Sequence, residues 1–231
     1  MQRRPAEEEN VSAYYPLFLN LNAKACLVVG GGMVAERKVQ GLLEARASVI
    51  VVSPTLTATL YGLVDKGVIA HVRRSFHHED VAGCALVIGA TDDAEVNGRI
   101  AMAARQRGIP VNIVDTPELC DFIAPSVLRR GDVQIAISTG GRSPTLAKRL
   151  RQGLEVLIGP EYGELAGLLG RLRTALRRRE ITPAGRKALY ERLIEASGLP
   201  LIAHPPVLPS QVHRVRSRRR RYTHAIRARR P

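Results

Sequence analysis

A glycine-rich turn is the first feature of the sequence that could do chemistry. The run GGGMVA at residues 30–35 follows an apolar stretch expected to be a strand and opens a stretch with helical spacing, so it satisfies G-x-G-x-x-A in a meaningful context. Gly30 would permit the tight turn, Gly32 would let the backbone approach a pyrophosphate, and Ala35 would allow close packing of helix on sheet. The helix N-terminus adds amide donors. The motif predicts a dinucleotide site, and a glycine-rich turn without a ligand is the alternative.

The residues after the second expected strand bear on which dinucleotide is bound. An acidic residue is typical there, about 20 positions after the glycines, where it holds the ribose hydroxyls of NAD. This chain has Ser53, Pro54 and Thr55 instead. Without a carboxylate to repel a 2′-phosphate, and with no nearby Arg assigned to one, the residues leave both NAD and NADP open. The hydroxyls of Ser53 and Thr55 are expected to bind the adenosine ribose.

The run from Gly89 to Asp92 follows the fourth expected strand. The small residues Ala90 and Thr91 would let the nicotinamide half of the cofactor lie across the carboxyl edge of the sheet. Thr91 and Asp92 could equally cap the next helix, and the two roles are compatible.

Asp115 is the best candidate for a catalytic acid or base. It ends the fifth expected strand, in the run VNIVD, and should project into the crevice where a nicotinamide reacts. A carboxylate partly desolvated at the edge of a cleft can have a pKa raised toward a useful range. An Asx-turn leading into Thr116 and Pro117 is an equally good local explanation.

A hydroxyl-rich loop at residues 138–143, directly before an expected helix, indicates an anion site. Ser143 is suited to cap a helix that has Pro144 at its first position. Charge for carboxylates could come from Arg142, Lys148 and Arg149, and from Arg129 and Arg130, although a capped helix with a solvated basic face competes with this interpretation. The candidate substrate-binding residues are Ser138, Thr139, Gly140, Gly141, Arg142 and Ser143.

Short apolar runs alternate with helical segments along the first half of the chain. This pattern predicts an α/β fold of the Rossmann type, with a doubly wound parallel sheet that would position these residues. A helix is expected between the first two strands, with Ala35, Val39, Leu42 and Leu43 on one stripe, and another from Ala94 to Arg107. The expected strands are Ala25–Val29, Ser48–Val52, Ile69–Val72, Ala85–Gly89 and Pro110–Val114.

The pattern changes after Asp115. Strands are expected at Asp121–Leu128 and Val133–Ser138, with a turn at residues 129–132, and three helices between Pro144 and Ser197, broken near Gly159-Pro160 and Thr182-Pro183. We therefore expect a dinucleotide-binding domain at 1–115, a small β-containing dimerisation and substrate segment at 116–143, a helical part at 144–200 and a tail at 201–231.

The charge and composition restrict the class of protein. Nine arginines lie between Arg214 and Arg230, and no Asp or Glu follows Glu195, so most of the net charge of +14 belongs to a C-terminal segment expected to be a solvated, disordered tail. Nucleic-acid binding would rest on this tail alone. No stretch is long and apolar enough for a membrane helix or an export signal, which indicates a cytoplasmic protein.

The cysteines and histidines predict neither a disulfide framework nor a metal site. Cys26 and Cys84 lie in apolar runs expected to be strands, and the three cysteines lack CxxC spacing, so free thiols in a reducing compartment are expected. His71, His77 and His78 do not have the spacing of a dedicated metal site. The metal-binding residues, if any, stay unknown from the sequence.

Five motifs follow one another along the chain: Tyr14–Leu21, Val28–Lys38, Ala90–Asp93, Val111–Asp115 and Ser138–Pro144. Together they resemble the precorrin-2 dehydrogenase and sirohydrochlorin ferrochelatase family, the N-terminal region of siroheme synthases. The resemblance covers Tyr14 to about Arg178.

The resemblance implies NAD-dependent oxidation of precorrin-2 to sirohydrochlorin by a homodimer. It implies a catalytic role for Asp115 and dinucleotide contacts at Met33, Val34, Pro54 and Thr55. The substrate is a tetrapyrrole with eight carboxylates, which explains why basic groups should flank the site. Some relatives also insert Fe(II), which would be a substrate here, and larger relatives carry a methyltransferase domain that 231 residues cannot contain. A regulatory module that binds NAD without chemistry is the alternative function.

Overall fold

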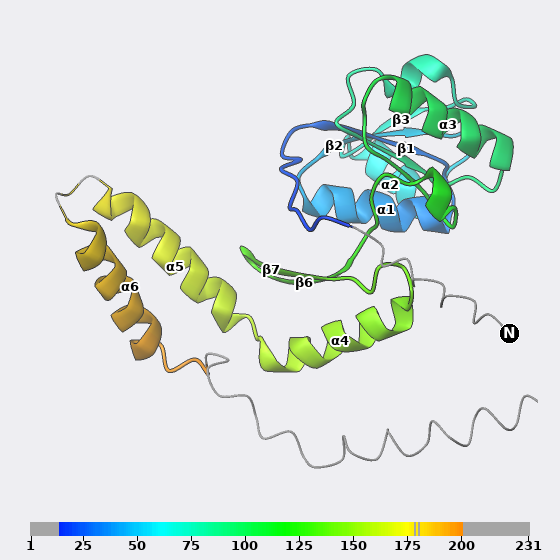
Figure 1. Cartoon of the computed structure of the whole chain (residues 1–231). Helices are drawn as coiled ribbons and strands as arrows, with labels where there is room; N and C mark the ends of the chain where they lie inside the picture. Colours follow the sequence, from blue (N-terminus) through cyan, green and yellow to red (C-terminus); the bar gives the residue numbers. More distant parts are fainter. Residues whose placement is uncertain (1–13, 178, 180, 201–231) are drawn as a thin grey trace, which may run out of the picture. The chain divides into compact units, whose positions relative to one another are not determined.

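The structure is a computed structural model that describes residues 14–177, 179 and 181–200 (Figure 1). The basic segment expected to be a disordered tail lies outside the described residues. The described residues divide into two compact units: those up to 127 with 136–152, called the α/β unit below, and 128–135 with those from 153 onward, called the helical unit.

A five-stranded parallel sheet forms the centre of the α/β unit, with strand order β3-β2-β1-β4-β5. This confirms the predicted Rossmann-like sheet. The first two strands have the predicted bounds, and the other three are one or two residues shorter. Cys84 precedes β4 rather than lying in it. The strands are β1 (Ala25–Val29), β2 (Ser48–Val52), β3 (Ala70–Val72), β4 (Leu86–Gly89) and β5 (Val111–Ile113).

Helices cover both faces of the sheet, because alternate residues of each strand face opposite sides (Figure 1). Val28 packs into a core with α1 (Met33–Glu44) and α2 (Ala58–Asp65), whereas Leu27 packs into a second core with α3 (Ala94–Gln106). The second core also holds Phe76 and the short helix η1 (His78–Val81). The predicted apolar stripe on α1 is confirmed, with Ala35 and Val39 fully buried.

The segment after β5 differs from its prediction. Residues 121–125 are not a strand, because Asp121 is tied to β5: its amide donates to the Val111 oxygen at 2.8 Å, and its carboxylate accepts from the Val111 amide at 3.1 Å. The hairpin consists of β6 (Ser126–Arg130) and β7 (Val133–Ile137), so Arg129 and Arg130 belong to a strand rather than to the turn. A short helix η2 (Pro117–Leu119) precedes it.

Three helices follow the hairpin, as predicted: α4 (Pro144–Leu157), α5 (Glu161–Leu176) and α6 (Pro183–Ala196). The breaks fall at the predicted sites. Thr182 caps α6 by accepting from the Gly185 amide at 3.2 Å, with Pro183 at the first helical position.

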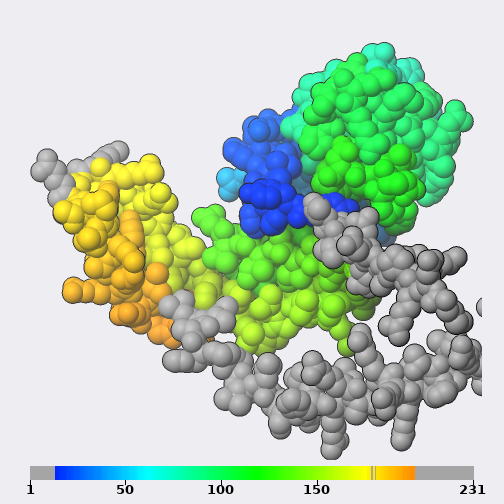
Figure 2. Space-filling view, viewed as in Figure 1, coloured from blue at the N-terminus to red at the C-terminus, as the bar shows by residue number. Residues whose placement is uncertain are grey.

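Apolar side chains remain exposed on the surface of the α/β unit. The segment from Tyr14 to Asn20 has no regular secondary structure and belongs to the dark blue surface of Figure 2. Tyr15 is 84% exposed and Phe18 is 68% exposed. Leu146 and Leu150 of α4 are also about half exposed.

All three cysteines are free thiols, as predicted, and Cys120 is only partly buried. Burial raises the pKa of the Cys26 thiol to about 11, so it is neutral at physiological pH. None of the helices in the described residues has the length and apolar character needed to cross a membrane.

Candidate active site

A cavity of about 440 Å³ opens at the carboxyl ends of β1, β2 and β4. This is the position at which parallel α/β sheets bind nucleotides, next to the switch point where β1 is flanked by β2 and β4. The lining brings together most of the predicted cofactor residues. These are Gly30, Gly32, Met33, Val34, Ser53, Pro54, Ala90 and Thr91.

The three glycines between β1 and α1 are needed for different reasons. Gly30 has φ +120°, and a Cβ there would collide with the backbone oxygen of Ala90. A Cβ at Gly31 would collide with the backbone oxygen of Thr55, so Gly31, which the sequence did not single out, is fixed by packing. A Cβ at Gly32 meets no atom within 4 Å, because this residue faces open space. The last observation fits the predicted approach of a ligand to the backbone at Gly32.

The N-terminus of α1 offers donors to an anion. Gly32 is the N-cap residue and has no side chain to bond the first-turn amides. A pyrophosphate placed there would accept from these amides, which is the usual arrangement in dinucleotide-binding folds. Ala35 lies in the core beneath this turn, in keeping with its predicted packing role. The residues of the cavity therefore fit a dinucleotide.

The loop after β2 is fixed against the glycine turn and against β3. The Thr57 amide donates to the Gly31 oxygen at 2.9 Å, and the Thr57 hydroxyl donates to Glu36 Oε2 at 2.7 Å. His71 Nε2 lies 2.9 Å from the Ser53 oxygen. Ser53 directly follows the last residue of β2 and is only 7% exposed, so a buried polar side chain stands at the start of this loop.

The loop after β4 is held by Asn97 and Asp93. The buried Asn97 amide donates to the Thr91 oxygen at 2.9 Å. The cap of α3 is Asp93, whose Oδ1 accepts from the amides of Glu95 and Val96 at 2.9 and 3.1 Å. The alternative role considered for Thr91 and Asp92 as capping residues is therefore wrong, because the residue directly before the first helical residue, Ala94, is Asp93. Thr91 instead bonds within the loop, accepting from the Asp93 amide at 3.1 Å.

Asp115 follows β5 at the same edge of the sheet, and its backbone is unusual. Its φ is +58°, a left-handed conformation that Asp tolerates better than most residues. The Val114 amide donates to the Gly89 oxygen at 2.9 Å, which joins the two strand ends next to Asp115. The side chain is exposed and is outside the lining of the cavity, so the expected partial desolvation is absent from the described chain.

A cation and a thiol lie close to Asp115. The half-buried Lys38 of α1 has a lowered pKa, chiefly through burial and then through Arg37, while Cys120 and Asp115 act in the opposite direction. Cys120 Sγ accepts from the Ile113 amide at 3.2 Å and donates to the Ile113 oxygen at 3.1 Å. These contacts fix the chain on both sides of Asp115.

The hydroxyl-rich loop is largely bonded to itself. The Gly140 amide donates to Ser138 Oγ at 3.0 Å, and the Ser143 amide donates to Thr139 Oγ1 at 2.9 Å. Ser143 caps α4 as predicted by accepting from the Leu146 amide at 3.2 Å. The glycines Gly140 and Gly141 have φ of +62° and +80° and provide the turn. The described loop is outside the lining of the 440 Å³ cavity.

Arg74 is the most important residue that the sequence prediction missed. It lines the cavity together with Ser53 and Pro54, so an Arg lies near the loop after β2, where the sequence assigned none to a 2′-phosphate. The residue follows β3, an edge strand of three residues whose end was not considered as part of the site. The loop pattern Arg-Arg directly after a predicted strand was the available signal. Other lining residues that were missed are Ser75, Phe76, Asp93 and Val96.

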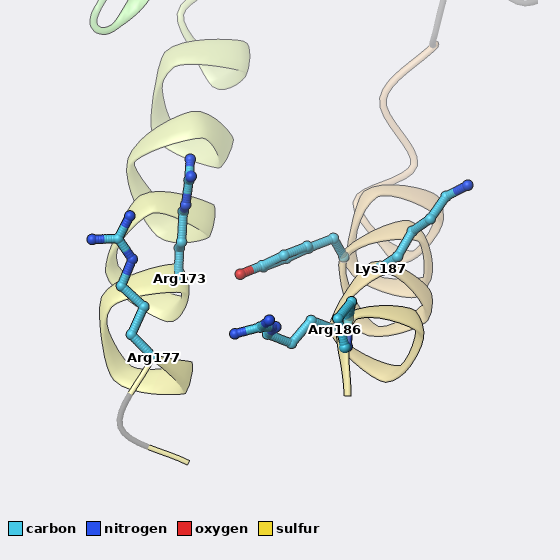
Figure 3. Close-up of a pocket in the computed structure, with 6 residues that line it drawn as sticks. Arg173, Arg177, Arg186 and Lys187 are labelled. Atoms are coloured by element: carbon cyan, nitrogen blue, oxygen red, sulfur yellow. The ribbon is translucent and has the colours of Figure 1, made fainter. Parts of the chain in front are cut away.

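A second cavity, of about 510 Å³, lies in the helical unit (Figure 3). Its charged lining residues among those described are all cations: Arg173 and Arg177 on the α5 side, and Arg186 and Lys187 of α6. Lys187 also pairs with Glu191 at 3.6 Å. The cavity has no glycine turn or strand end, so its chemistry differs from that of the dinucleotide site. No group of three or more His, Cys, Asp or Glu side chains suited to a metal ion occurs in the residues described here.

Comparisons with known proteins agree with this geometry. Residues 17–126 match a family model described as putative NAD(P)-binding, and residues 130–157 match one described as sirohaem biosynthesis protein central. Siroheme synthases of Nitrosomonas europaea and Methylococcus capsulatus are 46% and 45% identical over 79% of this chain. The chain spans 38% of the length of each of these two relatives.

The solved structure of SirC, a precorrin-2 dehydrogenase, has a similar fold. It matches with a TM-score of 0.67 and 28% sequence identity, over 78% of this chain and 89% of that one. The two family models occur in the order of the predicted dinucleotide-binding and central segments. Together with the parallel sheet and its glycine-lined cavity, these matches show that the chain belongs with the siroheme synthases, in the part that carries their putative NAD(P)-binding and central segments.

Proposed function

We propose that this chain oxidises precorrin-2 to sirohydrochlorin with NAD as the oxidant. The observation that carries the proposal is the glycine-lined cavity at the uncapped N-terminus of α1, at the same sheet edge as Asp115. Similarity to siroheme synthases and to the precorrin-2 dehydrogenase SirC supports the choice of substrate.

The dinucleotide supplies the redox chemistry when bound, because its nicotinamide accepts a hydride from the macrocycle. The chain supplies binding and orientation. Met33 and Val34 begin the helix whose amides would hold the pyrophosphate, and Ser53, Pro54 and Thr55 would hold the adenosine ribose. Ala90 and Thr91 would lie under the nicotinamide half.

Asp115 would accept the proton that the macrocycle loses, or orient the ring. Its left-handed backbone and the bonds that fix its neighbours favour one position for the carboxylate. Lys38 lies within electrostatic range of the carboxylate and would pair with its negative charge. Burial of Asp115 would then come from bound substrate.

The loop from Ser138 to Ser143 would bind carboxylates of the substrate. Its hydroxyls accept bonds from the loop backbone, but each O–H remains able to donate to an anion. The exposed side chain of Arg142 would add a positive charge.

We also propose that the protein is a homodimer. The exposed side chains of Tyr15, Phe18, Leu146 and Leu150 are apolar surfaces that a second copy would cover. Light scattering after gel filtration should give a mass near twice the 25.3 kDa of one chain, and a mass near that of one chain would contradict this part of the proposal.

An anaerobic incubation with precorrin-2 and NAD tests the reaction. The near-ultraviolet absorbance of NADH and the visible spectrum of sirohydrochlorin report the two products, and both should rise together. A chain that binds NAD but forms neither product would be a binding module instead. A parallel incubation of sirohydrochlorin with Fe(II) or Co(II) tests whether the chain also inserts a metal ion.

A further inference from the structure

Arg74 lies where the adenosine end of a dinucleotide is expected. β3 pairs with β2, and the Ser53 amide donates to the Val72 oxygen at 3.3 Å. The chain then turns sharply, with the Arg74 amide donating to the same Val72 oxygen at 2.9 Å. Arg74 thus joins Ser53 and Pro54 in the lining of one cavity, on the side of the sheet where the adenosine ribose is held in this fold.

The guanidinium group of Arg74 is fixed by an almost buried carboxylate. Nη1 and Nη2 donate to the two oxygens of Asp80 at 2.8 and 2.6 Å, and Nη1 also donates to the Ser75 oxygen at 2.9 Å. The Asp80 side chain is 9% exposed, and its Oδ2 accepts from the His77 amide at 2.8 Å. Asp80 therefore acts as a positioning residue for Arg74.

One edge of the guanidinium group keeps its donors. A guanidinium group has five N–H bonds in a fixed planar fork. The bonds to Asp80 and Ser75 use those on Nη1 and one on Nη2, which leaves Nε–H and the second Nη2–H without a further hydrogen bond in the described residues. These two N–H groups lie side by side and match two oxygens of a phosphate.

The distribution of charge around the cavity is consistent with an anion binding to the Nε–H and Nη2–H groups of Arg74. The carboxylates among the lining residues are Asp92 and Asp93, which follow β4, whereas Ser53 and Pro54, which follow β2, bring no carboxylate. NADP differs from NAD by a phosphate on the 2′-oxygen of the adenosine ribose. Asp80 offsets part of the positive charge of Arg74. The site should therefore accept a cofactor with the 2′-phosphate without requiring that phosphate.

We infer that Arg74, held by Asp80, admits the 2′-phosphate, so that this chain binds NADP as well as NAD. The inference rests on the dinucleotide site of the proposed function and extends it to the choice of cofactor. It concerns binding and can be tested without the tetrapyrrole substrate.

Calorimetric titration of the full chain with NAD and with NADP tests the inference. The wild type should bind both within about tenfold of each other. Arg74→Ala should weaken NADP by roughly tenfold or more, because a bidentate charged contact is lost, and NAD by less than about threefold. Arg74→Lys keeps the positive charge but loses the planar guanidinium group. Its affinity for NADP should lie between that of the wild type and that of Arg74→Ala.

Arg73→Ala is the matched control, because Arg73 is exposed and is outside the cavity lining. It should leave both affinities unchanged, and retained NAD binding shows that each variant is folded. Equal weakening of both cofactors by Arg74→Ala, or no weakening of NADP, overturns the inference. A wild type that binds NAD but excludes NADP also overturns it and leaves the proposed function intact, whereas a chain that binds neither overturns the dinucleotide site itself.

Discussion

The α/β unit and the helical unit differ in how much of their surface they bury by themselves. The α/β unit has two cores that sandwich the sheet, with Leu27, Val28, Val39 and Ile100 fully buried. In the described part of the helical unit, α5 buries only Leu176, and α6 buries no residue. Leu168 of α5 is 47% exposed.

The difference indicates which unit is preorganised for chemistry. Cavity-lining loops of the α/β unit are attached to a packed sheet by short hydrogen bonds, such as those of Asn97 and Thr57. The helices α5 and α6 bury only Leu176 between them, far fewer side chains than the helices that cover the sheet. The dinucleotide site therefore depends on the α/β unit, whose own core holds the loops that line it.

Truncating a core leucine should have the largest effect on stability. Leu27→Ala leaves a cavity between β1 and α3 and should cost about 2–5 kcal/mol of unfolding free energy. Leu168→Ala removes an exposed side chain from a helix and should cost less than about 0.5 kcal/mol. Urea unfolding measures both, and equal costs would contradict the contrast between the units.

A methyl group at Gly30 should damage the site. In Gly30→Ala the new residue must keep a positive φ, at a cost of roughly 1–3 kcal/mol, and its Cβ would collide with the Ala90 oxygen. The variant should therefore lose NAD binding. Gly67→Ala is the control, because Gly67 also has positive φ (+65°) but a Cβ there meets nothing within 4 Å. Gly67→Ala should keep NAD binding, and loss of binding in both variants would show that the close approach at Gly30 is not the cause.

The parts of the fold that repeat a local pattern were predictable from the sequence. The five strands and α1 follow from apolar runs and helical spacing, and the glycine turn follows from its position between them. The start of β6 was not predictable, because Asp121 is held by β5 through a contact ten residues away. Arg74 was missed for a similar reason: its place in the cavity depends on the pairing of β3 with β2 and on Asp80.

Acid should weaken the ion pair that fixes Arg74. The Arg74 guanidinium group lowers the pKa of Asp80, helped by the His77 amide, while burial acts in the opposite direction. Because the pKa is lower in the folded state, the stabilisation is present above the ordinary carboxyl pKa and is lost as the pH falls through the lowered value. The melting temperature of wild type minus that of Asp80→Asn should shrink between about pH 6 and about pH 3, and a constant difference would contradict the assignment.

The smallest effect concerns the thiols. Burial raises the pKa values of Cys26, Cys84 and Cys120, so none should be a reactive thiolate at about pH 8. Mass spectrometry after brief alkylation should find the partly buried Cys120 modified before Cys26, and all three modified in urea. Rapid modification of Cys26 in the native protein would show that β1 is less well packed than described.

The most direct test of the central claim compares wild type with Asp115→Asn in anaerobic NAD reduction by precorrin-2. The wild type should form NADH and sirohydrochlorin in equal amounts. Asp115→Asn should bind NAD with unchanged affinity while its rate falls by about 10²–10⁴-fold, because the residue is proposed to act on the macrocycle and not on the cofactor. No NADH from the wild type, or an undiminished rate in Asp115→Asn, would contradict the proposed reaction.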